Sequence, residues 1–304
     1  MTTRRTRFSA NVRFLGSWFR GMALFAALRL PANAQAPSTQ ATAALPPIPT
    51  NHLVLHLSLD EADGQGWTYD RSPSKLRART VNVRWIPTGR VGGACDFMPE
   101  QSYLAVSNPV IGGLTSWTFS VWFRLIRLED RPVYLFDKGT TNGLQVQILP
   151  APGDSNLHGR VRLVVGSEEC VSTNTVADRR WHHLAIVADG QAVRLWLDGA
   201  VQPGQVAWSA PWPTNAHPWV IGMNLSSPTP DNAQWALNGV VDDWMVFNRA
   251  LSEEELAAIR AAAQPRFTRG QVQQRLREIH ELYERGLLLP EFYERKVLEC
   301  EANL

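Results

Sequence analysis

Residues 180–200 read RWHHLAIVADGQAVRLWLDGA and carry the strongest structural signal of the chain. Apolar side chains alternate along 181–188 and again along 192–198, which is the period of a half-buried strand. Asp189-Gly190 separates the two runs and Asp198-Gly199 follows the second, and Asp-Gly favours a tight turn between antiparallel strands. These residues therefore predict a β-hairpin.

The same alternation recurs on both sides of this hairpin. One face is apolar in LVLHLSLD (53–60) and in WTFSVWFRL (117–125), where the other face carries Thr, Ser, Trp and Arg. The two apolar faces consist of Leu53, Leu55, Leu57 and Leu59, and of Phe119, Val121, Phe123 and Leu125. Further strands are expected at 92–97, 102–106, 132–136, 143–149, 159–165, 218–222 and 240–247. About a dozen short strands separated by Gly, Pro, Asn and Asp predict a mainly β chain, folded as a two-sheet antiparallel sandwich.

Two stretches of the segment 51–263 carry a family resemblance. Residues 180–200 are similar to a hairpin of the laminin-G-like jelly rolls, which belong to the concanavalin A-like lectin/glucanase superfamily. GVVDDWMVFNRALSEEEL (239–256) resembles the closing strand and following short helix of that family, and Ser252 and Glu255 stand at capping-box spacing. Weaker similarities are SWTFSVWFRL (116–125), FDKG (136–139) and VGGACDF (91–97). The resemblance implies a jelly-roll sandwich with lectin-like binding.

Catalysis is not expected, although the same superfamily contains glucanases. Retaining hydrolysis needs two carboxyl groups about 5–5.5 Å apart, and the superfamily's enzymes place them on one strand. No Glu-x-Asp-x-Glu stretch occurs in the chain. Glu168-Glu169 are neighbours that point to opposite faces, as are His182-His183, of which we expect one packed and one solvated. A hydrolase with an unusual acid pair remains the alternative.

Four aspartates are candidates for a structural Ca²⁺ site: Asp60, Asp63, Asp242 and Asp243. The first two follow the first strand, and the other two interrupt an otherwise apolar last strand, where an acid needs a partner. Jelly rolls that this segment resembles often join these strands through Ca²⁺, which takes six to eight oxygen ligands including backbone carbonyls. The other interpretation is that these carboxylates cap turns.

Four tryptophans in and after the Pro-rich stretch AWSAPWPTNAHPW (207–219) are candidates for binding a sugar: Trp208, Trp212, Trp219 and Trp235. An exposed indole offers a flat apolar face and one hydrogen-bond donor, which suits a sugar ring. The other interpretation is that each of them packs beneath the loop, because Trp is usually well buried.

The N-terminal region predicts export. Five arginines precede the apolar run GMALFAAL (21–28), and Ala32-Asn33-Ala34 offers small residues to a signal peptidase. We therefore expect a signal peptide at 1–34, a Pro-rich linker at 35–50 and a periplasmic, cell-surface or extracellular location. Because six of the 30 Lys and Arg residues lie in 1–36, the rest carries 24 basic and 28 acidic residues. This balance does not favour nucleic-acid binding, and no apolar run is long enough for a transmembrane segment. The odd number of cysteines suggests no disulfide framework, and Cys95 is expected in the core.

Residues 264–304 predict a small α-helical hairpin. Thr268 and Gln271 fit a capping box, Gly286 should end the first helix, and Pro290 suits the first turn of a second. Val272, Leu276, Ile279 and Tyr283 form one apolar stripe, and Phe292 or Tyr293, Val297 and Cys300 form another. The segment resembles the short C-terminal (SHOCT-like) hairpins of bacterial proteins. We expect it to dock on another copy, giving a homo-oligomer through 266–300, or on its own sandwich.

Taken together, the sequence predicts an exported, non-catalytic binding or adhesion protein whose sandwich contacts a glycan or a surface protein. A purely structural scaffold is the further alternative, because similar jelly rolls carry unrelated functions on variable loops.

Overall fold

The computed structural model describes residues 48, 50–61, 64–98, 102–107, 110–128, 130–139, 143–150, 157–212, 217–224, 236–263 and 268–301. The predicted signal peptide, most of the predicted linker, and the site candidates Asp63 and Trp235 lie outside these residues. None of the helices in this described part is long and apolar enough to cross a membrane.

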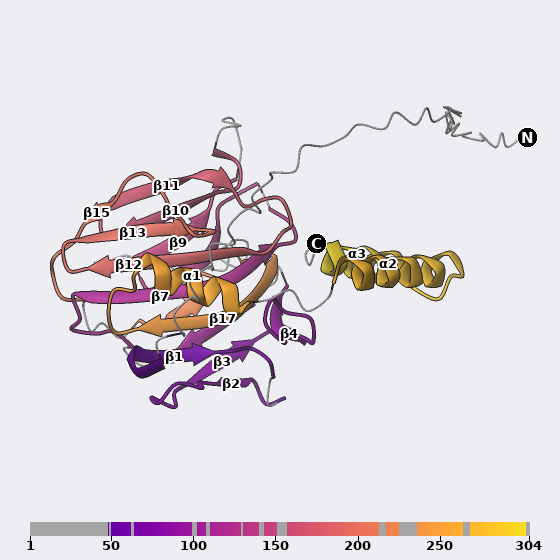
Figure 1. Cartoon of the computed structure of the whole chain (residues 1–304), viewed down its shortest axis with the longest axis horizontal. Coiled ribbons are helices and arrows are strands. Elements are labelled where there is room, and N and C mark those ends of the chain that lie inside the picture. The colour runs from indigo at the N-terminus through magenta and orange to yellow at the C-terminus, as the bar shows by residue number, and fades with distance from the viewer. Residues whose placement is uncertain are drawn as a thin grey trace, which may run out of the picture. The chain divides into compact units, whose positions relative to one another are not determined.

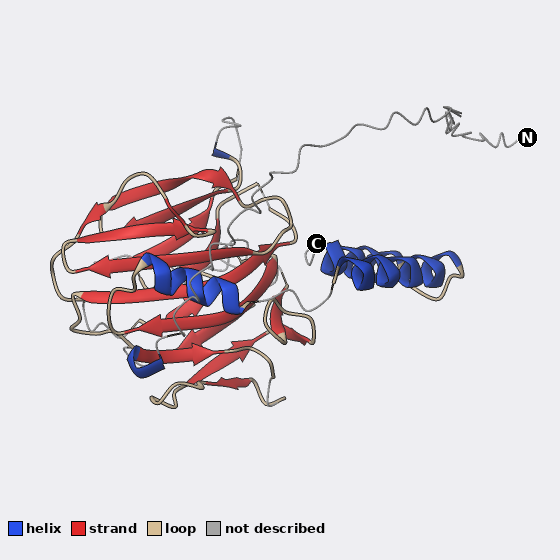
Figure 2. Ribbon diagram, viewed as in Figure 1, coloured by secondary structure: helices blue, strands red, loops and turns tan. Residues whose placement is uncertain are grey.

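Two antiparallel sheets make up most of the described chain (Figures 1 and 2). The first, sheet A, has the order β14-β13-β12-β7-β17-β5-β4, with β1 also paired to β17 and β15 to β13. Its strands are β1 (Leu53–Leu57), β4 (Val83–Ile86), β5 (Ala94–Phe97), β7 (Ser116–Leu125), β12 (His182–Asp189), β13 (Ala192–Leu197), β14 (Ala200–Val201), β15 (Val206–Ala207) and β17 (Gly239–Phe247).

The second, sheet B, has the order β11-β10-β9-β8-β16-β6-β3-β2. Its strands are β2 (Trp67–Tyr69), β3 (Arg77–Val81), β6 (Tyr103–Val106), β8 (Val133–Asp137), β9 (Leu144–Ile148), β10 (Arg160–Val165), β11 (Glu168–Thr175) and β16 (Trp219–Ile221). A 3-10 turn (Thr50–His52) precedes β1, and three helices follow β17. The predicted two-sheet sandwich is confirmed. The predicted hairpin is β12–β13, with Ile186 opposite Leu195 and Ala188 opposite Val193.

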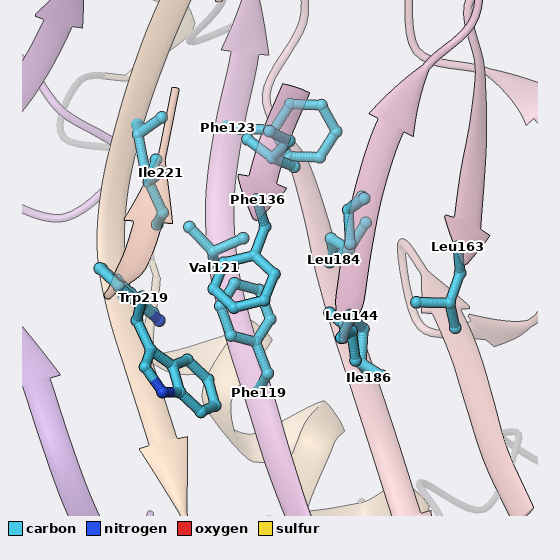
Figure 3. Close-up of a cluster of buried hydrophobic side chains, with 14 of the residues drawn as sticks. Phe119, Val121, Phe123, Phe136, Leu144, Leu163, Leu184, Ile186, Trp219 and Ile221 are labelled. Atoms are coloured by element: carbon cyan, nitrogen blue, oxygen red, sulfur yellow. The ribbon is translucent and has the colours of Figure 1, made fainter. Parts of the chain in front are cut away.

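The core lies between the sheets, where alternate side chains of each strand meet. Phe119, Val121 and Phe123 of β7 face sheet B, as their period predicts, and Figure 3 shows them beside Phe136 and Trp219. The rings of Phe119 and Phe136 lie 4.7 Å apart between centroids. Each buried side chain of this size stabilises the fold by about 1.5–3 kcal/mol, so this apolar layer is the main source of stability.

The outer face of sheet A is buried as well. Helix α1 (Glu253–Ala262) lies over it (Figure 1). Its Leu256 and Ile259 pack in one cluster with Met245 and Phe247 of β17. The helix begins at the predicted capping box of Ser252, in which both hydrogen bonds are present. This cover explains why the second face of β7 is buried although it is partly polar.

The two neighbouring histidines of β12 do not divide into a packed and a solvated one. His182 is 7% and His183 1% exposed. His183 forms a 2.9 Å hydrogen bond with the Ser120 hydroxyl, and burial lowers its pKa to about 3, so this ring is neutral. The expectation fails because the outer face of sheet A is covered rather than open to water.

The C-terminal hairpin consists of α2 (Arg269–Glu284) and α3 (Pro290–Glu301). The Thr268 capping box, the end of α2 before Gly286 and the start of α3 at Pro290 are as predicted. The two stripes pack on each other, however, with Val272, Ile279 and Cys300 buried between the helices. The sequence did not decide whether Phe292 or Tyr293 belongs to the second stripe. It is Tyr293, whose ring stacks on that of Tyr283 with 4.2 Å between centroids, while Phe292 is exposed.

Each of the three structural parts holds one buried cysteine. Cys95 lies in sheet A, Cys170 in sheet B and Cys300 in α3, and these three residues form no disulfide. Burial and nearby carboxylates raise the pKa of Cys95 to about 12 and that of Cys170 to about 11. Cys95 is the core residue that its sequence context predicts.

Candidate functional site

Strand β17 changes partner halfway along one edge. Its residues 239–241 pair with β5, its residues 244–247 pair with β1, and the opposite edge pairs with β7. Asp242 and Asp243 lie at the change, where the register with β7 shifts. Asp243 has a φ of 47°, a left-handed backbone conformation that is rare for residues other than glycine. Both acids therefore lie where the partner of β17 changes from β5 to β1.

The two acids differ in how their oxygens are used. Asp243 is paired with His56 of β1, with 2.8 Å between Oδ1 and Nε2. Asp242 is fully buried, and its Oδ2 accepts a 2.7 Å hydrogen bond from the Val91 amide. Its Oδ1 has no hydrogen-bond partner among the described residues. A buried carboxylate oxygen without a donor is costly, so this atom needs a proton or a cation.

The loop between β4 and β5 joins Asp242 to Asp60. The Gly93 amide donates to Asp60 Oδ1 at 2.9 Å, while Val91 of the same loop donates to Asp242. A Cβ at Gly93 would lie 2.8 Å from the Asp60 backbone, so only glycine permits this approach. Two of the four predicted metal residues, Asp60 and Asp242, are thereby brought to one loop, while Asp243 is bound to His56 of β1.

Negative charge on Asp242 is unfavourable, although Arg71 pairs with Asp60 at 3.0 Å and Arg90 interacts electrostatically with Asp242. Burial is the largest cause that raises the pKa of Asp242 well above its usual value, and the charges of Asp243 and Asp60 add to it. Among the described residues no three His, Cys, Asp or Glu side chains form a metal-binding group by themselves. A Ca²⁺ ion here would need backbone carbonyls as well, and the predicted site stays a prediction.

The predicted aromatic site does not present the expected indoles. Trp212 and Trp219 are 1% and 2% exposed and belong to the core between the sheets. Trp212 lies edge-on to Trp117, with 5.2 Å between ring centroids. Trp208 is half-buried beside Trp212, at 5.8 Å. Trp212 and Trp219 close the core beneath the Pro-rich stretch, so neither offers a face to a ligand.

A concave surface, unexpected from the sequence, lies beyond the end of β7. This hollow of about 200 Å³ is lined by Leu125, Ile126, Arg127, Leu128, His158, Ala177 and Arg179. Leu125 is buried and Leu128 half-buried, whereas the arginines and the histidine are exposed. The hollow therefore combines an apolar floor with a polar, basic rim, which is typical of small-ligand sites.

Backbone contacts fix the three segments that form the hollow. The amides of Ile126 and Arg127 donate to the Asn238 carbonyl at 2.9 and 3.4 Å. The Val176 amide donates to the Gly159 carbonyl at 2.8 Å. A Cβ on Gly159 would lie 2.6 Å from the Ala177 Cβ, so glycine allows His158 and Ala177 to come close.

The segment 178–180 is held by a histidine between two acids. Nε2 of His182 lies 2.8 Å from Asp178 Oδ1, and its Nδ1 lies 2.7 Å from Asp198 Oδ2. Burial alone would lower the pKa of His182, but the hydrogen bonds and charges of Asp198 and Asp178 raise it overall. Asp178 also accepts from the Arg180 amide at 2.9 Å, which leaves Arg179 between two fixed residues.

Sequence patterns gave no signal for this hollow, because its residues come from three separate connections. The predicted surface acids Glu168 and Glu169 are exposed on β11. They are adjacent in one strand and form no facing pair of the kind that retaining hydrolysis needs.

Several solved structures share the fold. The binding domain of Paraclostridial Mosquitocidal Protein 1 matches with a TM-score of 0.55 at 16% identity, covering 69% of this chain and 52% of that one. The botulinum neurotoxin serotype D/C binding domain matches at 0.55 and 12%, covering 71% and 53%. The chain thus spans about half the length of these toxin domains.

Domain 4 of AbnA, a GH43 extracellular arabinanase from Geobacillus stearothermophilus solved with arabinotriose, matches with a TM-score of 0.52 at 15% identity. That match covers 67% of this chain and 96% of the domain. No curated protein matches the sequence significantly.

A family match extends over residues 99–257, which is just over half of the chain, and ends before the C-terminal hairpin. The SHOCT-like assignment of that hairpin stays a prediction. The matched residues include the β12–β13 hairpin and β17, which also carried the resemblance in the sequence. The chain belongs to the Laminin_G_3 family of the concanavalin A-like lectin/glucanases superfamily.

Proposed function

We propose that the chain is an exported, non-catalytic carbohydrate-binding protein whose glycan enters the hollow lined by residues 125–128, His158, Ala177 and Arg179. The observation that carries this proposal is the hollow itself, an apolar floor with a rim of hydrogen-bond donors. Family membership and the likeness to binding domains support it, including a domain solved with arabinotriose.

The dimensions and chemistry of the hollow suit a sugar better than a protein surface. Its volume of about 200 Å³ is below the 300–1,000 Å³ typical of drug-sized ligands and suits one ring of a longer chain. The half-buried Ile126 and Leu128 can cover the apolar face of a ring while Arg127, Arg179 and His158 donate to its oxygens. Fixed backbone segments lower the entropy that binding would cost.

Glycan-array binding by the full chain tests the proposal. Ala177→Phe would fill the hollow and is expected to remove the glycan signal. Ser167→Phe is the matched control, because this exposed residue lies in the turn at the opposite end of β10 and β11. Signal from no glycan, or equal signal from both variants, would refute binding through the hollow.

Export is the part of the proposal that rests on residues 1–34. The chain, produced with its own N-terminus in a Gram-negative host and fractionated, is expected outside the cytoplasm and to begin at Gln35. Recovery of the intact chain from the cytoplasm alone would contradict this location.

We also propose that Ca²⁺ joins β1, the β4–β5 loop and β17 through Asp60 and Asp242, with Asp243 and Asp63 as the remaining candidates. The orphaned Asp242 Oδ1 fits a cation that accepts hard oxygen ligands. The ion would bind the Asp242 oxygen that no described residue contacts, beside Arg71, which pairs with Asp60 at 3.0 Å, and Arg90. Calcium should therefore raise the melting temperature over that in chelator, with Mg²⁺ as a control for ionic strength. Equal midpoints would remove the proposal.

We propose self-association through 266–300, but by residues near the turn of the hairpin and not by the two apolar stripes. The stripes are used within the hairpin, but Leu287, Leu289 and Phe292 are 60%, 74% and 46% exposed near its turn. Because the core of the hairpin is small, the hairpin gains stability when these three exposed side chains are buried against the same side chains of a second copy. Light scattering of the full chain should show a dimer, and Leu289→Ser with Phe292→Ser should give a monomer. A monomer in the unmodified chain would overturn the proposal.

A further inference from the structure

Strands β2, β3 and β6 form one end of sheet B, and β2 is the last strand there (Figure 1). Ala78 of β3 and Leu104 of β6 lie in the core between the sheets, so the alternate residues of these strands point outward. The outward side chains are mostly aromatic and basic: Trp67, Tyr69, Arg77, Arg79 and Tyr103. No acid occupies an outward position of the three strands. This end of the sheet therefore presents a basic and aromatic surface.

The outward side chains of β2 and β3 alternate across the sheet. Tyr69 lies opposite Arg77, and Trp67 lies opposite Arg79. Arg77 leans diagonally, and its guanidinium carbon lies 4.1 Å from the centre of the Trp67 ring. Long side chains can make such a diagonal contact between neighbouring strands. Tyr69 is 56% exposed, more than any other described Phe, Tyr or Trp. The surface thus displays one ring beside a guanidinium that a second ring holds in place.

The contact with Trp67 engages the flat side of the Arg77 guanidinium. The N–H donors of this group lie in its plane, so they point past the edge of the indole rather than into it. Arg79 stands two residues further along the same strand, and both arginines are exposed. At the rise of a β-strand their Cα atoms are about 7 Å apart, which lets both side chains approach one anionic group.

The acid nearest to these residues in the sequence, Asp70, is used inside the turn that joins β2 to β3. Asp70 is 4% exposed. Its carboxylate accepts from the Ser72 amide and hydroxyl, both at 2.7 Å, from the Leu76 amide at 3.0 Å and from the His56 amide at 2.8 Å. These hydrogen bonds fix the turn and tie it to β1. The outward surface is therefore formed before a ligand binds, which lowers the entropy lost on binding.

We infer that the β2–β3 face, formed by Trp67, Tyr69, Arg77 and Arg79, binds an acidic polysaccharide. A uronic acid ring stacks on Tyr69 while Arg77 and Arg79 bind its carboxylate. Hydrogen bonds between guanidinium and carboxylate are charge-assisted and about twice as strong as neutral ones. The exposed ring of Tyr69 matches the flat apolar side of a sugar. A glutamate-rich peptide would supply the same charge but no such flat side, so the surface favours the sugar.

This inference does not depend on the glycan site proposed above. In the strand order of sheet B, β2 is at the opposite end from β11 and β10, whose connections contribute His158 and Ala177 to the hollow. The two surfaces therefore share no residue and can be tested one at a time.

The test is calorimetric titration of the full chain with three probes of equal length: a galacturonic acid hexamer, a neutral galactose hexamer and a glutamic acid hexapeptide. The galacturonic acid hexamer is expected to bind at least about tenfold more tightly than either of the others, and less tightly as salt rises. Equal binding of the two sugars would overturn the acidic specificity. Equal or tighter binding of the peptide would show that charge alone is recognised and would overturn the choice of a sugar.

Charge-matched variants assign the effect to the β2–β3 face. Replacing both Arg77 and Arg79 by Gln should lower the affinity for the galacturonic acid hexamer at least about tenfold. The control is Arg269→Gln with Arg277→Gln, which makes the same change in net charge at two exposed positions of α2 and should alter the affinity less than about twofold. Equal losses in the two double variants would overturn the site.

The aromatic part of the site has its own pair of variants. Tyr69→Ser should lower the affinity for the same probe about threefold, whereas Tyr69→Phe keeps the ring and should retain it. Equal losses in these two variants would contradict stacking on the ring.

Two further measurements keep the outcome clear. Melting curves report whether a variant folds, and Arg79→Gln alone gives an independent reduction if loss of the Arg77 contact with Trp67 disturbs β2. Ala177→Phe, which fills the hollow, should leave the binding of the galacturonic acid hexamer unchanged. If Ala177→Phe removes that binding and the arginine variants do not, the β2–β3 face is refuted while glycan binding in the hollow is retained.

Discussion

Two aspartates on the outer face of sheet A are buried completely, yet their surroundings are opposite. Asp96 of β5 pairs with Arg84 of β4 at 2.7 Å and also with Arg295 of α3. Asp242 of β17 has an amide donor on one oxygen and no partner on the other among the described residues. Asp96 lies opposite Val240, only two residues from Asp242 along β17.

The difference shows two ways in which a buried carboxylate is accommodated. At Asp96 the chain supplies its own cations, so that position is complete as a structural contact. At Asp242 the charges of Asp243 and Asp60 add to the effect of burial, no described group donates to Oδ1, and this oxygen is satisfied only by a proton or an ion from solution. A buried acid alone thus says little about function, whereas a buried acid without a donor indicates a ligand.

The largest effect is expected for Asp96→Asn. Removing the buried charge leaves Arg84 and Arg295 without their shared partner, and we expect a loss of about 2–3 kcal/mol in the free energy of unfolding. This is below the 3–5 kcal/mol of fully buried pairs, because both arginines reach solvent. Urea denaturation measures it, and Asp189→Asn, which loosens the part-exposed pair with Arg194, should cost less than about 1 kcal/mol. Equal losses would erase the distinction drawn for Asp96.

Asp242→Asn should act in the opposite direction. Without calcium the neutral side chain relieves a buried, unpaired charge and should stabilise the sandwich by about 1–2 kcal/mol. The same variant should lose the calcium-dependent rise in melting temperature. Asp243→Asn is the control: it removes a repelling charge next to Asp242 but also weakens the pair with His56, and it should stabilise less than Asp242→Asn. Destabilisation by Asp242→Asn in chelator would mean that the carboxylate is satisfied as it stands.

His182 adds a third arrangement, one cation between two acids, and predicts a smaller, pH-dependent effect. Because the folded pKa of His182 lies above 6.5, its contribution is complete below that pH and is lost as pH rises through the folded value. The pKa values of Asp178 and Asp198 are lowered below 3.8, so their contribution is lost as pH falls past it. Melting temperatures should decline on both sides of this window, and His182→Gln should remove the decline on the alkaline side. An unchanged alkaline limb in the variant would contradict the assignment.

Arg295→Ala should have the smallest effect. Asp96 keeps Arg84 at 2.7 Å, so the loss is expected below about 1 kcal/mol. Hydrogen exchange of α3 should nevertheless quicken, while that of β5 stays the same. A loss as large as that of Asp96→Asn would show that Arg295 is the main partner of this acid.

Most of the fold was predictable because strand periodicity and turn dipeptides are local signals. The alternation in β7 identified Phe119, Val121 and Phe123 as core residues, and Ser252 and Thr268 marked the starts of two helices. The buried second face of β7 was not predictable, since it depends on α1, more than a hundred residues later in the chain.

The candidate sites divide in the same way. Asp60 and Asp242 could be proposed from acids at the ends of apolar strands, and the structure brings both to the β4–β5 loop. Trp212 and Trp219 failed as ligand residues, since composition does not tell a packed indole from a displayed one. The hollow was not predicted, because Arg127, His158 and Arg179 lie in three segments that are distant in the sequence and come together only in the folded chain.

The three buried thiols can report when parts of this molecule open. Cys95 of sheet A and Cys170 of sheet B are both buried in the core between the sheets, and Cys300 is buried in the core of the hairpin. An alkylating reagent will modify a buried cysteine only when the surrounding core opens, so mass spectrometry of the modified peptides can time the opening of the sandwich and that of the hairpin separately. Calcium or a bound glycan would then slow the alkylation of cysteines in the part that it stabilises and leave the rate in the other part unchanged.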